Sequence, residues 1–114
     1  MRVVSLLLLG LVAAAPAAAH HGWGSYDSDK PITIVGAIRV ISLQNPHGEM
    51  TVAHDGRPWL VTLAPLTRMN TRGATADILP VGATVTAYGY PKRDGTPEIR
   101  AEWVEAGGRR YQLR

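Results

Sequence analysis

The sequence predicts an all-β domain: a small OB-like, five- to six-stranded Greek-key barrel with one short helix between strands 3 and 4. Strand-like runs alternate apolar and polar residues over most of residues 32–114. The period becomes helical only once, within residues 65–79, which gives the strand–strand–strand–helix–strand–strand order of an OB-fold. The first run has Gly36 in its middle, as expected of a strand that bends at a barrel corner. A small β-sandwich and an open meander remain alternatives.

Residues 1–19 have the three parts of a secretory signal peptide. Met1 and Arg2 form the positive start, residues 3–12 are apolar and uncharged, and residues 13–19 are small apart from Pro16. The apolar run is far shorter than the ~20 residues of a membrane-spanning helix, so we expect no permanent membrane anchor. We therefore divide the chain into a signal peptide (1–19), an N-terminal arm (20–31) and an OB-like barrel domain (32–114). After cleavage the protein is expected to be periplasmic or secreted.

The arm and the first three strands follow in order. The arm is rich in Gly, Ser and Asp, and its aromatic residues Trp23 and Tyr26 are expected to pin it to the domain. Strand 1 (residues 32–43) is long and curved, and residues 44–48 form a turn. Strand 2 (residues 49–54) alternates, and Asp55-Gly56 is a hairpin signal leading into strand 3 (residues 58–63).

The helix and the last strands complete the barrel. Pro65 suits a first helical turn and Gly73 a C-cap, which places a two-turn helix over residues 65–72. Strands 4, 5 and 6 are expected at residues 83–90, 98–105 and 109–113. Strand 5 is expected to turn Ile99, Ala101 and Trp103 inward. Truncation of a core Trp103 to Ala should then cost ~3–5 kcal/mol.

Composition excludes several classes of function. The net charge is only +3 and the basic residues are scattered, so no nucleic-acid-binding stripe is present. The chain contains no cysteine, which removes thiolate metal sites and cysteine nucleophiles. No elbow glycine pattern surrounds Ser25, so a serine hydrolase is not expected. The strand spacing of Trp59, Trp103, Tyr88 and Tyr90 favours core and barrel wall over base or sugar stacking.

The chain resembles a family of short exported bacterial proteins classed as a domain of unknown function. The resemblance covers nearly the whole mature chain and is most specific at His20-His21 and at the turn Asn45-Pro46-His47. It implies an OB-like barrel in the periplasm and no established activity. The other matching segments are Tyr26-Asp27, the Gly36 strand, Leu79 to Gly82, Thr84 to Tyr90 and Arg93 to Gly95.

His20, His21 and His47 are the candidate metal ligands. Cleavage after Ala19 makes His20 the first residue, and its α-amine and imidazole can chelate a metal. Cleavage after Ala17 instead puts His20 third behind a free amine, which is also a copper(II) or nickel(II) chelate. Pro46 restricts the backbone beside His47, which is expected at the tip of the loop that borders the ligand-binding face of OB-folds. Nitrogen-only ligation favours copper(II), with zinc or nickel possible.

The sequence therefore predicts a periplasmic metal-binding protein, and a binding protein rather than an enzyme. Asp27, Asp29 and Glu49 are candidate outer-shell partners or oxygen ligands, whereas His54 is expected on the hairpin surface. A copper oxygenase with a terminal histidine is a less favoured alternative, because so small a barrel offers little surface to a large substrate. A different class also remains open: a non-metal OB-like adaptor for a protein, peptide or glycan. The expected partners are a metal ion and another periplasmic protein, without nucleic acid.

Overall fold

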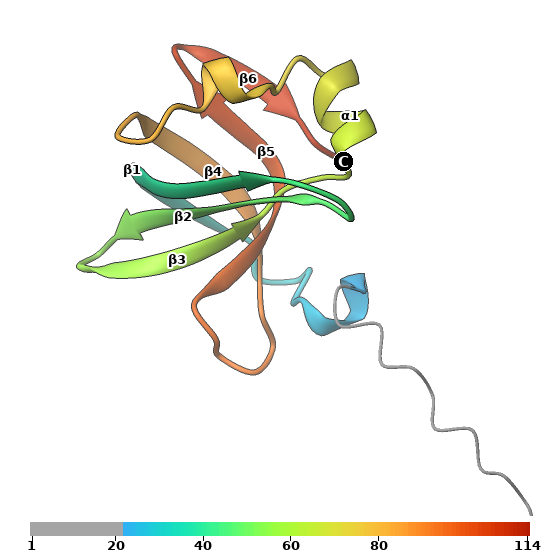
Figure 1. The fold of residues 1–114 in the computed structure, drawn as a ribbon. Helices are drawn as coiled ribbons and strands as arrows, with labels where there is room; N and C mark the ends of the chain where they lie inside the picture. Colours follow the sequence, from blue (N-terminus) through green and yellow to red (C-terminus); the bar gives the residue numbers. More distant parts are fainter. Residues whose placement is uncertain (1–21) are drawn as a thin grey trace, which may run out of the picture.

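The protein folds into a single β-barrel with one short helix at its end (Figure 1). The structure, a computed structural model, describes residues 22–114; the predicted signal peptide, His20 and His21 lie outside the described residues. Its strands are β1 (Ile32–Leu43), β2 (Gly48–His54), β3 (Arg57–Thr62), β4 (Thr84–Pro91), β5 (Glu98–Ala106) and β6 (Arg109–Gln112). The helices are the 3-10 turn η1 (Trp23–Ser25), α1 (Leu66–Thr71) and the 3-10 turn η2 (Ala76–Ile78).

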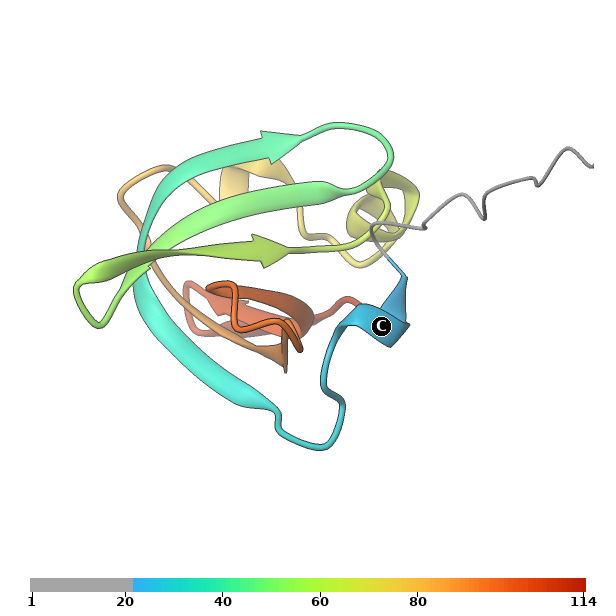
Figure 2. The same ribbon diagram turned by 90° about the horizontal axis from the view of Figure 1, so that it is seen from below.

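Five strands close the barrel and β6 extends it. The sheet order is β3-β2-β1-β4-β5-β6, and a further parallel pairing of β3 with β5 joins the two ends of the five-stranded part. β1 bends so far that its first half pairs with β4 and its second half with β2. The same curvature is visible when the molecule is viewed from below (Figure 2). The predicted class, an OB-like barrel, is therefore confirmed.

The predicted helix lies within residues 65–79, where the hydrophobic pattern changes from a strand period to a helical period. α1 connects β3 to β4 through η2, begins directly after Pro65 and buries Met69 in the core. Among residues 22–114 it is the only α-helix. None of the helices described over this range is long and apolar enough to cross a membrane.

The core follows the predicted alternation in β2 and β4. Met50 and Val52 of β2, and Val85 and Ala87 of β4, point into the barrel and are buried. The inward side chains are mostly aliphatic because the sequence lacks phenylalanine. Trp59 is only partly buried and packs against the core from one side.

Strand β5 differs from the prediction because it contains a β-bulge. Tyr88 pairs with Trp103, but the next residue of β4, Gly89, pairs with Ala101, so Glu102 is an extra residue. The bulge shifts the alternation by one, and Val104 rather than Trp103 enters the core. The prediction that Trp103 is a core residue is therefore wrong. Its ring lies outside, stacked on Tyr88 at 5.3 Å, with the Arg110 guanidinium 3.6 Å from its centroid.

Gly36 is required by a close approach between two strands. A Cβ at this position would lie 1.8 Å from the carbonyl oxygen of Ala53 on β2. Gly89 meets β5 in a similar way, with a Cβ position 2.2 Å from the Arg100 carbonyl oxygen. Both contacts are with backbone, so a side chain there could be accommodated only by moving a strand.

We predict that Gly36→Ala lowers the free energy of unfolding by about 3 kcal/mol, the upper end of over-packing effects. Gly24→Ala is the matched control, because a Cβ there meets no atom within 4 Å. It should change stability by less than about 0.5 kcal/mol. Chemical denaturation of both variants measures the difference, and a near-neutral Gly36→Ala would show that β1 does not need this contact.

We also predict that Trp103→Ala costs about 1 kcal/mol, the scale of a surface stacking and cation–π contact rather than of core truncation. Ile99→Ala removes a fully buried neighbour on the same strand and should cost about 2–5 kcal/mol. Urea unfolding of the two variants compares them directly. A Trp103→Ala loss as large as that of Ile99→Ala would contradict the outward placement.

Candidate functional site

Residues 22–27 of the arm are fixed to the barrel by backbone hydrogen bonds. Tyr26 forms a β-bridge with Lys92, and the Asp27 N–H donates to the Pro91 carbonyl at 2.8 Å. Arg93 adds two contacts, through its own N–H to the Ser25 carbonyl at 3.0 Å and through Nε to the Gly24 carbonyl at 3.2 Å. The described part of the arm is therefore an integral part of the fold.

Two aromatic side chains complete the anchor, as the sequence predicts. Tyr26 is 1% exposed, and its hydroxyl donates a hydrogen bond to the Glu98 carboxylate. Trp23 lies against the edge of Tyr90, with the guanidinium carbons of Arg100 and Arg114 at 4.2 and 4.3 Å from its ring centroid. We call this group of Trp23, Arg100 and Arg114 the Trp23 clamp.

The anchor also shifts the ionisation of its own groups. Burial, and then the hydrogen bond to Glu98, raises the pKa of Tyr26 to about 12. The hydrogen bond from Tyr90 to Glu102, and then burial, raises the pKa of Tyr90. Burial lowers the pKa of Arg100, and the positive charges of Arg68 and Arg114 add to this effect. Both tyrosines therefore remain neutral hydrogen-bond donors through the physiological range.

His47 lies in the β1–β2 loop, but its side chain does not project into solvent. The side chain is 8% exposed and both ring nitrogens lie out of contact with solvent. Its Nδ1 is 3.7 Å from Oε1 of Glu49. The following residue, Gly48, exchanges backbone hydrogen bonds with Leu63 and Ala64, which fixes the base of the loop. The expectation of an imidazole presented at the loop tip is therefore corrected: His47 is packed inward beside a carboxylate.

The other sequence candidates occupy different places. Asp27 accepts a hydrogen bond from the Asp29 N–H and lies 3.9 Å from Arg93, so it serves the arm itself. His54 is in the β2–β3 hairpin as expected, but it is only partly exposed. Its Nδ1 lies 3.0–3.2 Å from the backbone of Val35 at the bend of β1. Within residues 22–114, no group of three or more His, Asp or Glu side chains could hold a metal ion.

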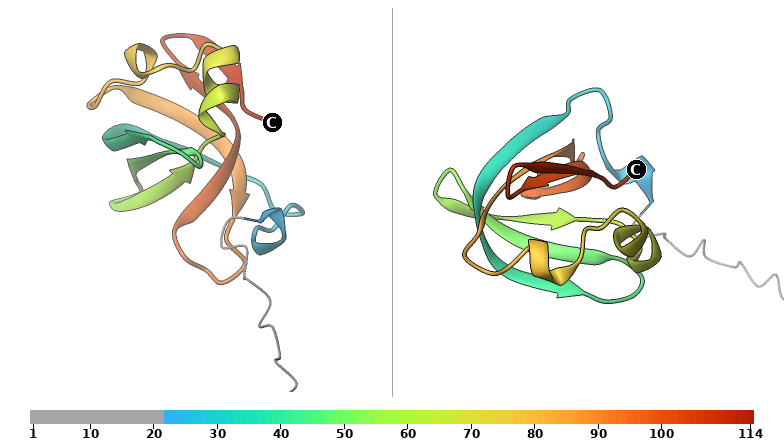
Figure 3. Two further views of the ribbon diagram at one scale, coloured as in Figure 1. Left: turned by 45° about the vertical axis from the view of Figure 1, so that its right-hand side comes forward. Right: turned by 90° about the horizontal axis from the view of Figure 1, so that it is seen from above.

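The arm and the His47 loop lie on the same side of the barrel. The described chain begins at Gly22, on the side where the β1–β2 loop and α1 also lie, whereas the β2–β3 hairpin with His54 points to the opposite side (Figures 1 and 2). Two further views show the same arrangement of arm and helix (Figure 3). Of the two described histidines, His47 is therefore the one on the side of the arm.

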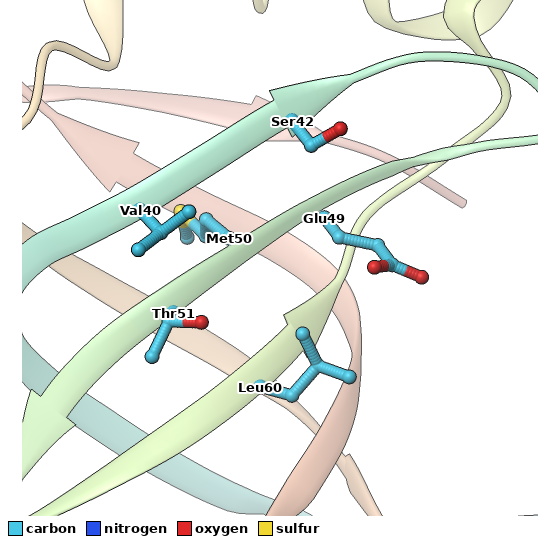
Figure 4. A pocket seen from close by; sticks show the side chains of 6 residues that line it. All are labelled: Val40, Ser42, Glu49, Met50, Thr51 and Leu60. Carbon is cyan, nitrogen blue, oxygen red and sulfur yellow. The ribbon is translucent and has the colours of Figure 1, made fainter.

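The outer face of β1, β2 and β3 carries a shallow hollow (Figure 4). Val40, which is 59% exposed, and Leu60 form its apolar walls, and Ser42, Glu49 and Thr51 surround them. Its volume of about 70 Å³ is far below the roughly 300–1,000 Å³ of small-molecule sites. The hollow can accept a side chain of a partner but not a cofactor.

The sequence did not reveal the Trp23 clamp. Trp23 was expected to pin the arm, but its partners Arg100 and Arg114 are far away in the chain and have no spacing relation to it. In the sequence these two arginines are single basic residues outside any motif, so no pattern assigned them a role.

Comparison with known proteins supports the fold and leaves the activity open. The model of a family described as a family of unknown function (DUF6152) matches residues 9–99. No curated protein matches the chain in sequence. Among solved structures, the ZRD-deleted mutant of TiaS in complex with agmatine is similar, with a TM-score of 0.55 and 14% identity. The match covers 76% of this chain but only 27% of that one, and at this identity it shows the fold alone.

We predict that Tyr26 makes the protein sensitive to alkali. In the unfolded chain tyrosine ionises near pH ~10, whereas in the fold its pKa is about 12. The stabilisation from neutral Tyr26 is complete below the first value and is lost as the pH rises towards the second. The free energy of unfolding of the wild type should therefore fall faster than that of Tyr26→Phe over this interval.

The measured quantity is the free energy of unfolding of the wild type minus that of Tyr26→Phe, in which the contributions of the other tyrosines cancel. This difference should be constant between about pH 7 and 9 and should shrink above about pH 10. A difference that stays constant to higher pH would mean that the Tyr26 hydroxyl ionises equally in both states.

Proposed function

The chain belongs to this family of unknown function, so family membership assigns it no activity. From its own residues, we propose that it is an exported, periplasmic metal-binding protein. The proposed metal is copper(II), with zinc or nickel as alternatives. The proposed ligands are the α-amine freed by cleavage and the imidazoles of His20, His21 and His47. The signal-peptide pattern and the two cleavage sites that each leave an amine-plus-histidine chelate support this proposal.

One structural observation carries the proposal: the arm is anchored on the side of the barrel where His47 lies. Gly22 follows His21 directly, and Trp23 is held in the clamp. The described chain therefore begins, one residue after His21, on the side of the barrel where the β1–β2 loop also lies (Figure 1). An unanchored arm would give no reason to associate them with one loop rather than another.

Glu49 gives His47 the partner that metal-bound histidines commonly have. A carboxylate near a metal-bound imidazole orients the ring and raises its basicity. The 3.7 Å separation of Nδ1 and Oε1 is longer than a hydrogen bond, so Glu49 supports the proposal as a nearby negative charge. Because the described residues hold no complete ligand set, the proposed site needs the N-terminal histidines to bring the metal to His47.

Copper(II) is the preferred metal on chemical grounds. Imidazole and amine nitrogens in a tetragonal set suit copper(II) and nickel(II), and copper(II) has the highest divalent affinity. The chain has no cysteine, so a thiolate site for zinc or copper(I) is excluded. A role in metal storage, delivery or sensing follows from binding alone and requires no catalytic residue.

A second candidate, a non-metal adaptor, is favoured by the outer face of β1 to β3. This is the usual ligand-binding face of OB-folds, and here it exposes Val40, which is 59% exposed. The small hollow between Val40 and Leu60 suits a partner side chain. Binding of this kind would be independent of the N-terminal amine.

We predict that the correctly processed protein binds one copper(II), with an affinity that depends on both the free amine and His47. A form with extra residues before His20 should bind much more weakly because the chelating amine is lost. His47→Ala should weaken binding but keep the terminal chelate. Affinity should also fall as the pH drops through about 6.5, because protons compete for the imidazoles.

Titration of copper(II) into these three proteins, followed by the visible d–d absorption, measures the effect. His54→Gln is the matched control, since His54 lies on the opposite side of the barrel, and it should bind like the wild type. Equal affinity in the processed protein, the extended form and His47→Ala would overturn the metal site and favour the adaptor.

A further inference from the structure

We propose that the outer face of β4, β5 and β6 binds an acidic polysaccharide, that is, a linear polymer of sugar rings that carry carboxylates. The surface consists of Tyr88, Tyr90, Trp103 and Arg110 together with the Trp23 clamp, and we call it the aromatic face. None of these residues is a proposed metal ligand, so this inference and the metal site can fail independently.

The rings of the aromatic face form a continuous chain of contacts on the outside of the barrel. Trp103 of β5 is paired with Tyr88 of β4 and stacks on it, with 5.3 Å between the ring centroids. Tyr90, two residues along β4, lies 6.3 Å from Tyr88, and Trp23 lies 6.0 Å from Tyr90. Tyr88, Trp103 and Trp23 are half-buried, so each of these rings keeps part of its surface in solvent. Such a chain of rings suits an extended polymer better than a single small molecule.

A guanidinium group lies over each of the two indoles of this face. The guanidinium carbon of Arg110 is 3.6 Å from the Trp103 centroid, and those of Arg100 and Arg114 are 4.2 and 4.3 Å from the Trp23 centroid. A guanidinium that stacks on a ring keeps N–H groups at its edge, which is the geometry that binds carboxylates in a bidentate manner. The aromatic face therefore combines apolar ring surface with carboxylate-binding groups.

Positive charge is in excess at the end of the aromatic face that carries the clamp. Arg68 of α1 donates from Nη1 to the Leu113 carbonyl at 3.2 Å, next to Arg114 in the chain. Neither Arg68 nor Arg114 forms an ion pair with an Asp or Glu of residues 22–114. In addition to burial, the positive charges of these two residues lower the pKa of Arg100, so both lie near enough to repel it. Carboxylates of a ligand would relieve this repulsion.

Two carboxylates beside the rings favour a polymer of sugars over other acidic partners. Glu102, the extra residue of the β5 bulge, accepts a hydrogen bond from Tyr90, and Glu105 pairs with Arg110 at 2.7 Å. An ionised carboxylate has about four acceptor positions, so both groups can also accept hydrogen bonds from sugar hydroxyls, whereas they would repel the phosphate on every unit of a nucleic acid. The core of a protein interface is depleted of charged residues, but here charged groups lie over the rings themselves.

Polygalacturonate, a linear acidic polysaccharide, is the probe, and isothermal titration calorimetry of the processed protein at about 0.15 M salt measures its affinity. Trp103→Ala should weaken binding roughly fivefold or more, the low end of what stacking on an aromatic side chain contributes. Arg114→Ala should weaken it roughly threefold to tenfold, the scale of one hydrogen bond. Both residues lie outside the hydrophobic core cluster, so circular dichroism should show an unchanged fold. If Trp103→Ala is nevertheless poorly folded, Arg114→Ala at its exposed position decides the test.

Arg57→Ala is the matched control. Arg57 also stacks on an indole, with its guanidinium carbon 4.8 Å from the Trp59 centroid, but it belongs to the β2–β3 hairpin. The variant loses the same charge as Arg114→Ala and should bind within about twofold of the wild type, since salt screens a distant surface charge. Dextran, an uncharged polysaccharide, should not bind.

Several results would overturn the proposal. Absence of polygalacturonate binding would do so directly. Equal losses in Arg114→Ala and Arg57→Ala would show only a general attraction between a basic protein and a polyanion. Dextran binding as tight as that of polygalacturonate would show that the arginines recognise no carboxylate. Polyglutamate and single-stranded DNA are titrated in parallel, and tighter binding of either, with the same dependence on Trp103, would assign the aromatic face to a peptide or a nucleic acid instead.

Discussion

The contact between Gly36 of β1 and the carbonyl of Ala53 on β2 is the constraint on which the rest of the barrel depends. Because no Cβ separates the two backbones, β1 can cross β2 closely and turn from one neighbour to another along its length. That turn brings β4 to one half of β1 and the β2–β3 hairpin to the other. β3 can then meet β5, and both the arm and the His47 loop are placed by strands that this bend positions.

The fold was largely predictable because the alternation of apolar and polar residues and the positions of turn residues are local signals. The bounds of β1, the helix after Pro65 and the inward set of β2 and β4 all follow from period and turn residues. The bulge in β5 was not predictable, because Trp103 and Val104 are both apolar and either parity satisfies the pattern. Packing against Gly89 decides between them, and that information lies on another strand.

The candidate site was predictable only in its parts. Histidine chemistry and the loop position of His47 can be read from the sequence, whereas its inward packing beside Glu49 depends on how the loop base bonds to Leu63 and Ala64. The role of Arg100 and Arg114 was likewise hidden, since contacts with Trp23 across most of the chain leave no mark on spacing. The sequence therefore identified candidate ligands but not the contacts that anchor the arm at Trp23.

The parallel seam between β3 and β5 gives the arm a further significance. It contains three residue pairs, fewer than any other pairing within the closed barrel. Glu98 belongs to this seam and also accepts the hydrogen bond of Tyr26. The docked arm therefore stabilises the shortest strand pairing of the barrel, which is where we expect local opening to begin. Arm and barrel become one cooperative unit, in which local opening of the seam requires the arm to detach.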